Sequence, residues 1–226
     1  MVCKTYRDAP YEELLKLQTL EFEKRVECRK EESPLPDDLI FFVEHRPVYT
    51  LGKHGKIENL IVDEDYLRQN NVSLYHIGRG GDITYHGPGQ LTVYPILDMQ
   101  RYRLGIKDYV SLLEEAVIQT ISEYGIEGKR IEGATGVWIK DDKGERKISA
   151  IGVKCSRHVT MHGLALNISS DVSGFQRINP CGFTDKGVTS ISIERDMDTD
   201  FDEVVEKLKY SLIRLLQLRI ASPRNS

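Results

Sequence analysis

The sequence predicts an α+β domain over residues 1–226, in which helices pack against a mixed or largely antiparallel β-sheet. Three observations lead to this prediction. Strand-like segments outnumber helix-like ones, the strands come in meander-like runs with helices between them, and no Pro/Ser-rich linker or internal repeat divides the chain.

The first part of the chain carries alternating strand and helix signals. Residues Cys3 to Arg7 form an expected edge strand, and Pro10 suits the first turn of a helix. We expect that helix to run to about Arg29, because apolar residues recur at helical spacing: Tyr11, Leu14, Leu15, Phe22 and Val26. Short elements follow, expected as strands at 38–45, 48–51 and 72–77 and as a helix at 63–69.

The second part repeats the mixture with longer elements. An apolar strand is expected from Leu91 to Leu97, and an amphipathic helix from about Lys107 to Tyr124. Further strands are expected at 129–131, 135–140, 147–155 and 161–168, with a hairpin turn at 141–144. Thr199 is the expected N-cap of a final helix.

Composition excludes several classes of protein. The formal net charge of -4 argues against a general nucleic-acid binder, and the apolar runs are too short to cross a membrane. The N-terminus lacks signal-peptide or transit-peptide features, so we expect a cytoplasmic protein or a mature organellar one. No C-x-x-C pair occurs among the four cysteines, so a structural zinc site is not expected: Cys3, Cys28, Cys155 and Cys181.

Two glycine-rich loops stand out in the middle of the chain. Residues 78–81 read Gly-Arg-Gly-Gly, and residues 86–90 read His-Gly-Pro-Gly-Gln. Glycine allows the backbone to approach a ligand closely. A hairpin with flexible turns would explain an isolated glycine pair, but an arginine and a histidine among so many glycines favour a ligand site.

Candidate reactive residues come from three further segments. Cys181 lies between Pro180 and Gly182, a turn that could present a thiol into a cleft, although a buried and inert cysteine is an equal alternative. His86 and His162 each precede a glycine and could orient a ligand or serve a thiol as base. Taken alone, each histidine is more simply interpreted as a hydrogen-bonded structural residue.

Lys147 begins a strand that also contains Lys154. Strict alternation along this strand would place the two lysines on opposite faces, so that only one of them reaches a given cleft. A lysine at a strand end usually points to water. If it were buried instead, desolvation would lower its pKa and make it a usable base.

The run from Arg79 to Gln90, Arg-Gly-Gly-Asp-Ile-Thr-Tyr-His-Gly-Pro-Gly-Gln, resembles the signature of the octanoyltransferases of lipoate biosynthesis, the lipoyl(octanoyl)-carrier-protein:protein transferases. A second block, Gly136 to Val153, and a third, beginning with His162 to Asn167, match the same family in the same order. The third block continues with Pro180-Cys181-Gly182 and Val188-Thr189-Ser190. One departure is Lys154, where the family often has arginine.

This resemblance implies the fold shared by biotin and lipoate protein ligases. It implies an enzyme that moves an octanoyl group from octanoyl-acyl carrier protein to the N6-amine of a specific lysine. The acceptors would be the lipoyl domains of 2-oxoacid dehydrogenase complexes and the glycine cleavage H protein. The acyl group would arrive on the phosphopantetheine of acyl carrier protein, so no other cofactor and no metal is implied.

The resemblance also assigns roles to residues. The family's cysteine at the position of Cys181 forms an acyl thioester, and the lysine at the position of Lys147 is its dyad partner and lowers its pKa. The residues implied to line the acyl site are Arg79, Gly80, Gly81, Asp82, Ile83, Thr84, Tyr85, His86, Ala150, Ile151, Gly152, Gly163, Leu164 and Ala165.

Two other functions are alternatives to octanoyl transfer. An ATP-dependent lipoate or biotin protein ligase of the same fold would need no cysteine nucleophile, and Cys181 in its Pro-Cys-Gly context argues against it. A non-catalytic module that binds acyl chains or carrier proteins would need a pocket but no thiol.

For acidic protein partners we expect a basic rim, with these candidates: Lys53, Lys56, Arg101, Arg103 and Lys107.

Overall fold

The protein is built on an eight-stranded sheet. The computed structural model describes residues 1–179 and 187–221. The strands of this sheet are β1 (Val2–Ala9), β2 (Leu39–His45), β6 (Gln90–Ile96), β7 (Lys129–Ile131), β8 (Ala134–Asp141), β9 (Gly144–Ser156), β10 (Val159–Asn167) and β11 (Gly187–Val188). Their order is β1-β2-β6-β10-β9-β8-β7, with β11 paired to β9. Pairs β1–β2 and β11–β9 are parallel and the others are antiparallel, so the sheet is mixed.

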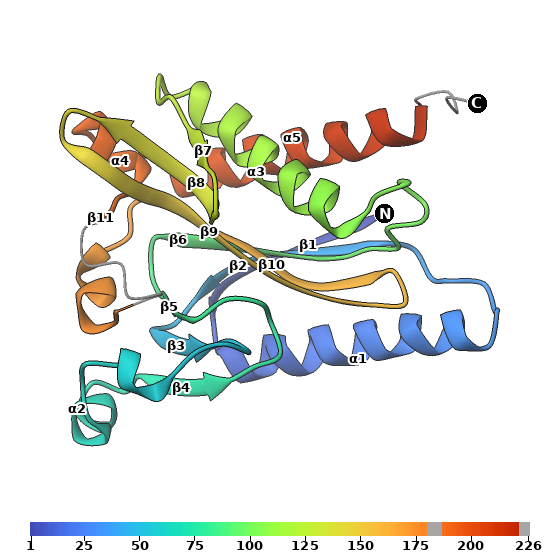
Figure 1. Cartoon of the computed structure of the whole chain (residues 1–226), viewed down its shortest axis with the longest axis horizontal. Coiled ribbons are helices and arrows are strands. Elements are labelled where there is room, and N and C mark those ends of the chain that lie inside the picture. The colour runs from blue at the N-terminus through green and yellow to red at the C-terminus, as the bar shows by residue number, and fades with distance from the viewer. Residues whose placement is uncertain (180–186, 222–226) are drawn as a thin grey trace.

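Helices cover both faces of this sheet and confirm the predicted α+β class. Helices α3 (Ile106–Ser122) and α5 (Phe201–Ala221) lie on one face, and α1 (Tyr11–Lys30) lies on the other (Figure 1). Strand β2 shows why both faces are covered. Ile40 and Phe42 pack in the core beneath α3 and α5, whereas Leu39, Phe41 and Val43 pack with α1. A continuous apolar run is what a strand buried on both faces requires.

A second, three-stranded sheet lies on the α1 side of the main sheet, near the N-terminal end of that helix (Figure 1). Its order is β4 (Ser73–His76), β3 (Val48–Leu51) and β5 (Ile83–His86). This small sheet has its own core around Tyr49 and Leu51. Short helices α2 (Glu64–Gln69) and η2 (Val172–Arg177) contact this sheet, and η1 (Ile57–Asn59) follows β3 along the chain. Helix α4 (Ile191–Arg195) lies instead beside the β8–β9 hairpin (Figure 1), where Glu194 accepts a hydrogen bond from Arg146.

The start of α5 corrects one expectation from the sequence. The carboxylate of Asp200 accepts hydrogen bonds from the backbone N–H groups of Asp202 (2.8 Å) and Glu203 (3.1 Å). Asp200 is therefore the N-cap, and the prediction of Thr199 was wrong by one residue. Both residue types cap helices well, so the sequence alone did not distinguish them.

No helix in the described part of the chain is both long and apolar enough to cross a membrane. In the same ranges, no three His, Cys, Asp or Glu side chains gather in a way that could hold a metal ion.

Candidate active site

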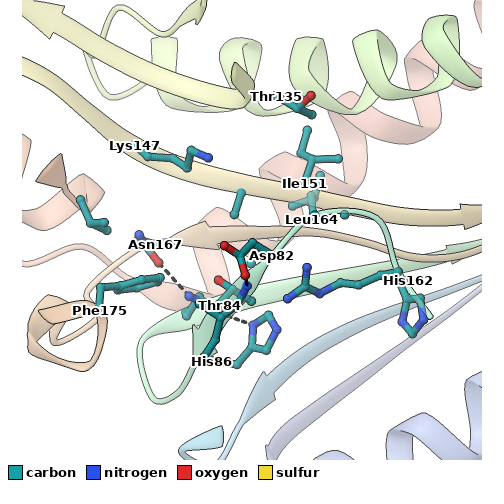
Figure 2. Close-up of a pocket in the computed structure, with 18 of the residues that line it drawn as sticks. Asp82, Thr84, His86, Thr135, Lys147, Ile151, His162, Leu164, Asn167 and Phe175 are labelled. Carbon is teal, nitrogen blue, oxygen red and sulfur yellow. Dashed lines mark hydrogen bonds between the residues drawn. The ribbon is translucent and has the colours of Figure 1, made fainter. Parts of the chain in front are cut away.

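A cavity of about 350 Å³ opens between the main sheet and the small sheet. Strands β9 and β10 form one wall, and the loop before β5 together with β5 itself forms another (Figure 2). The β7–β8 hairpin, η2 and the first turn of α1 complete the enclosure. This volume lies within the range of roughly 300–1,000 Å³ that is usual for small-molecule sites.

Most of the site residues expected from the sequence meet in this one cavity. Those that line it are Arg79, Gly81, Asp82, Ile83, Thr84, His86, Lys147, Ala150, Ile151, Gly152, Gly163, Leu164 and Ala165. Gly80 and Tyr85 do not. The N–H of Gly80 donates to the Val153 carbonyl (3.0 Å), which ties its loop to β9. The Tyr85 ring instead packs edge-on against Phe175, which does line the cavity.

The loop that carries Arg79 is braced from inside the protein. The Arg79 guanidinium is buried and donates to the carbonyl (2.8 Å) and hydroxyl (3.0 Å) of Thr50 on β3. The Asp82 carboxylate accepts from the Ile83 N–H (2.7 Å) and from the amide of Asn59 (2.6 Å). Both side chains therefore hold the shape of the cavity wall as well as facing the cavity.

Glycine is required where this loop crosses β9. A Cβ atom on Gly152 would lie 2.8 Å from the Gly80 carbonyl oxygen and 3.0 Å from Cδ of Arg79. Real Cβ atoms do not approach a backbone oxygen so closely, so Gly152 sets how near the Arg79 loop comes to the sheet.

A β-bulge corrects the expected direction of the lysines on β9. Trp138 pairs with Lys147 and the preceding Val137 pairs with Ser149, so Ile148 is an extra residue in β9. Alternation is therefore broken: Lys147 lines the cavity together with Ala150 and Gly152. The prediction that Lys147 and Lys154 point to opposite faces was wrong. The Lys154 ammonium lies over the ring of Phe22 on α1, the helix on the cavity side of the sheet.

Cys181 falls outside the described residues, so its distance from Lys147 is not part of the structure. The chain on either side of the undescribed stretch borders the cavity. Ile178 forms a β-bridge with Leu60, and both Ile178 and Val188 line the cavity. Val188 pairs with Lys147, and the Thr189 N–H donates to the Lys147 carbonyl (3.0 Å).

Two buried histidines, His86 and His162, line the cavity, and a third, His45, lies 6.0 Å from the His86 ring between ring centroids. Burial lowers the pKa of His45 to about 4, of His86 to about 3 and of His162 to about 3. Nearby cationic Arg79 adds to this effect for His86 and His162. All three side chains are therefore neutral at pH 7.

Several cavity residues were missed by sequence reasoning. Gln90 and Asn167 end two of the motifs, so a polar side chain at the end of each motif was the available signal. Trp138 also lies within a matched block. Tyr11 carried no signal, because it reads as the first apolar residue of an ordinary helix.

The basic residues expected to form one rim are divided between two regions. Arg101 and Arg103 lie in the turn between β6 and α3, at the opposite end of the molecule from the small sheet (Figure 1). Arg101 donates to the buried carboxylate of Asp38 (2.8 Å). Lys107, in the first turn of α3, follows the same turn. Of the five, Lys53 and Lys56 follow β3, and the Lys53 N–H bonds to the carbonyl of cavity-lining Arg79 (2.9 Å), so these two remain candidates beside the cavity.

Comparison with known proteins identifies relatives across most of the chain. A family model described as the lipoyl protein ligase A/B catalytic domain matches residues 15–213. An octanoyltransferase of Parabacteroides distasonis is 51% identical over 201 residues, covering 88% of this chain and 90% of that relative. An octanoyltransferase of Bacteroides thetaiotaomicron is 50% identical over 208 residues, covering 92% and 91% of the two chains.

Solved structures agree on the fold. The bipartite lipoate protein ligase of Thermoplasma acidophilum superposes with a TM-score of 0.70 at 17% identity, covering 96% of this chain and 84% of that one. A lipoate-protein ligase A bound with ATP gives 0.63 at 15% identity, with 96% and 84% covered. At these identities the likeness is one of fold. Together with the family match and the curated relatives, it places the chain in the lipoyl protein ligase A/B catalytic-domain family, among the octanoyltransferases of lipoate biosynthesis.

Proposed function

We propose that this enzyme transfers the octanoyl group through a thioester on Cys181, with Lys147 as the partner of that thiol. The acyl donor is octanoyl-acyl carrier protein, and the acceptor is the N6-amine of a lysine in a lipoyl domain. The observation that carries the proposal is the pairing of Val188 with Lys147 at the cavity wall, since it brings the chain that follows Cys181 beside the lysine.

In the first step the Cys181 thiolate attacks the carbonyl carbon of the donor thioester. A new C–S bond forms, the bond to the pantetheine sulfur breaks, and that sulfur leaves with the electron pair and takes up a proton. Exchange of one thioester for another is nearly isoenergetic, so cysteine suits a relay of this kind. A cationic Lys147 beside the sulfur would favour the reactive thiolate.

In the second step the acceptor amine attacks the acyl-Cys181 carbonyl. The C–N bond forms, the C–S bond breaks, and the thiolate of Cys181 returns. The amine must lose a proton, and a neutral Lys147 can accept it. Conversion of a thioester to an amide is downhill, so the second step draws the first forward.

The cavity walls suit an acyl chain. Ile83, Ile151 and Leu164 present apolar side chains to the cavity. Burial of each methylene of an alkyl chain contributes about 0.8 kcal/mol to binding. Arg79, whose guanidinium is bonded to Thr50, adds a fixed positive charge to the cavity wall.

The partners proposed from this chemistry are acyl carrier protein and the lipoyl domains of 2-oxoacid dehydrogenase complexes and the glycine cleavage H protein. We place the reaction in the cytoplasm. Lys53 and Lys56 are the remaining candidates for contact with acidic partner surfaces.

Intact-mass spectrometry tests the relay. Incubation with octanoyl-acyl carrier protein should add one octanoyl group to the wild type and to Cys155→Ala, whose cysteine is exposed, and none to Cys181→Ala. An adduct that persists in Cys181→Ala would refute the thioester. Acylation of a lipoyl domain that requires ATP and free octanoate would instead indicate a ligase.

A further inference from the structure

A chain of hydrogen bonds crosses the cavity floor and ends on His86. The Asn167 amide nitrogen donates to the Thr189 carbonyl (2.9 Å), and the Asn167 amide oxygen meets the amide nitrogen of Gln90 (2.9 Å). The Gln90 amide oxygen meets Nδ1 of His86 (2.7 Å). Figure 2 shows the dashed bonds that lead from Asn167 to the His86 ring.

The direction of this chain is fixed by backbone carbonyls, which only accept hydrogen bonds. Because Thr189 presents a carbonyl, Asn167 must turn its nitrogen toward it and its oxygen toward Gln90. The Gln90 nitrogen also donates to the Tyr85 carbonyl (3.1 Å), which fixes that amide independently. The Gln90 oxygen therefore faces His86, and it needs a proton on Nδ1.

The groups in this chain are well buried. Gln90 is 1% exposed, Asn167 4% and His86 7%. A flipped amide would point its oxygen at another acceptor, and each lost bond would leave a buried polar group without a partner, which is costly. The bonded arrangement is therefore strongly preferred over the flipped one.

The other ring nitrogen of His86 is left as a hydrogen-bond acceptor. Within residues 1–179 and 187–221 no donor is bonded to Nε2, and the ring lines the cavity. The ring is held in place by Tyr11, which stacks on it with 6.1 Å between ring centroids and 9° between planes. The buried ring stays neutral, so this nitrogen keeps its lone pair at pH 7.

We propose that Gln90 and Asn167 are positioning residues that hold His86 in the Nδ1–H tautomer, so that Nε2 accepts a hydrogen bond from an N–H group of the substrate. The inference rests on the proposed octanoyl transfer. An acyl chain and its thioester offer only acceptors, so the N–H must come from the amide groups of the pantetheine arm or from the attacking lysine amine.

Nitrogen-15 spectra of the histidine rings test the tautomer directly. At pH 7 the wild type should show His86 protonated at Nδ1 and unprotonated at Nε2. Gln90→Met removes the acceptor and should introduce a population protonated at Nε2. Gln90→Glu keeps an oxygen opposite Nδ1. Its second oxygen faces the Tyr85 carbonyl and the Asn167 amide oxygen, so the buried carboxyl is expected in its protonated form, which donates there and keeps the wild-type tautomer. Gln69→Met, at an exposed position on α2, is the matched control.

Kinetics of the separate half-reactions identify the source of the N–H. Gln90→Met should slow one half-reaction about tenfold, the value of one hydrogen bond of roughly 1.4 kcal/mol, while Gln90→Glu stays within a few-fold of wild type. A loss confined to acyl-enzyme formation assigns the N–H to pantetheine, and a loss confined to discharge onto the lipoyl domain assigns it to the amine.

The inference is overturned if wild-type His86 carries its proton on Nε2, or if Gln90→Met leaves the tautomer and both half-reactions unchanged. Should Gln90→Met not fold, Asn167→Leu serves in its place: it removes one of the two acceptors that orient the Gln90 amide, so it should introduce an Nε2–H population smaller than that of Gln90→Met. Asn167→Asp retains an oxygen that accepts from Gln90, and its protonated carboxyl can donate to the Thr189 carbonyl, so it should preserve the tautomer. A wild type with correct spectra but no octanoyl transfer would refute the proposed function and leave the tautomer assignment standing.

Discussion

The ammonium nitrogen of Lys147 lies 4.5 Å from the centroid of the Trp138 ring, its cross-strand partner on β8. A cation over an indole face gains about 0.5–2 kcal/mol, so the ring helps to hold Lys147 at the cavity wall. Ile148, the extra residue of the β-bulge, follows Lys147 directly. It breaks the alternation of side chains along β9, so the direction of Lys147 depends on its pairing with Trp138.

The first prediction concerns this ring. Trp138→Leu should slow acyl-enzyme formation by roughly 3- to 30-fold, the kinetic equivalent of the cation–π energy, and Trp138→Phe should slow it less. Both variants lose the indole N–H bond to the Ala134 carbonyl (2.8 Å), so their difference reports the aromatic face. Equal rates for the two variants in a single-turnover assay would contradict the role of the ring.

Lys147 itself should separate the two half-reactions. Lys147→Met removes the charge and the base, and should slow both acylation of Cys181 and discharge by at least about 100-fold, the usual contribution of a positioned acid or base. Lys147→Arg keeps a cation but cannot lose a proton at ordinary pH, so discharge should suffer more than acylation. Rapid-quench mass spectrometry of the acyl-enzyme measures each step, and an arginine variant with equal losses in both would argue against Lys147 as the base.

Gly152→Ala should damage the site more than the fold. The new methyl group would meet the Gly80 carbonyl at 2.8 Å and push the Arg79 loop away from β9. We expect a loss of about 1–3 kcal/mol in stability and a larger proportional loss in transfer rate. Gly105→Ala is the control, because its Cβ would find only Asp108 at 3.5 Å. Urea unfolding and transfer assays of both variants decide the matter, and wild-type activity in Gly152→Ala would show that the loop is not held by this contact.

Stability should fall as the pH drops below about 6.5. The pKa values of His45, His86 and His162 are lowered to about 4, 3 and 3 in the folded protein. Between those values and 6.5 the unfolded chain binds protons that the folded chain does not, so stability rises with pH across this window and is fully present above it. Each histidine contributes a slope of up to about 1.4 kcal/mol per pH unit.

Urea unfolding at pH 7.5, 6 and 5 measures this slope. His162→Gln should reduce it by about a third of the histidine contribution. His76→Gln, at an exposed position on β4, should leave it unchanged. A slope that is the same in all three proteins would mean that His162 is not buried in its neutral form.

Much of the fold was accessible from the sequence because it depends on local spacing. The apolar run of β2, the helical repeat of α3 and the hairpin after Asp141 each follow from the pattern of a few neighbouring residues. The glycine-rich motifs also lie at the cavity: Arg79 and His86 line one wall, and Lys147 on β9 lines another.

Other features of the site came only from the tertiary structure, because they depend on contacts between segments far apart in the chain. The bulge at Ile148 is set by pairing with β8. It places Lys147 and Lys154 on the same face of β9, whereas strict alternation would have put them on opposite faces. The first turn of α1 delivers Tyr11 to His86 because of how the helix docks on the sheet. Local sequence fixes the period of an element, but the register and docking of one element on another come from the summed packing of many distant side chains, and no single segment encodes that sum.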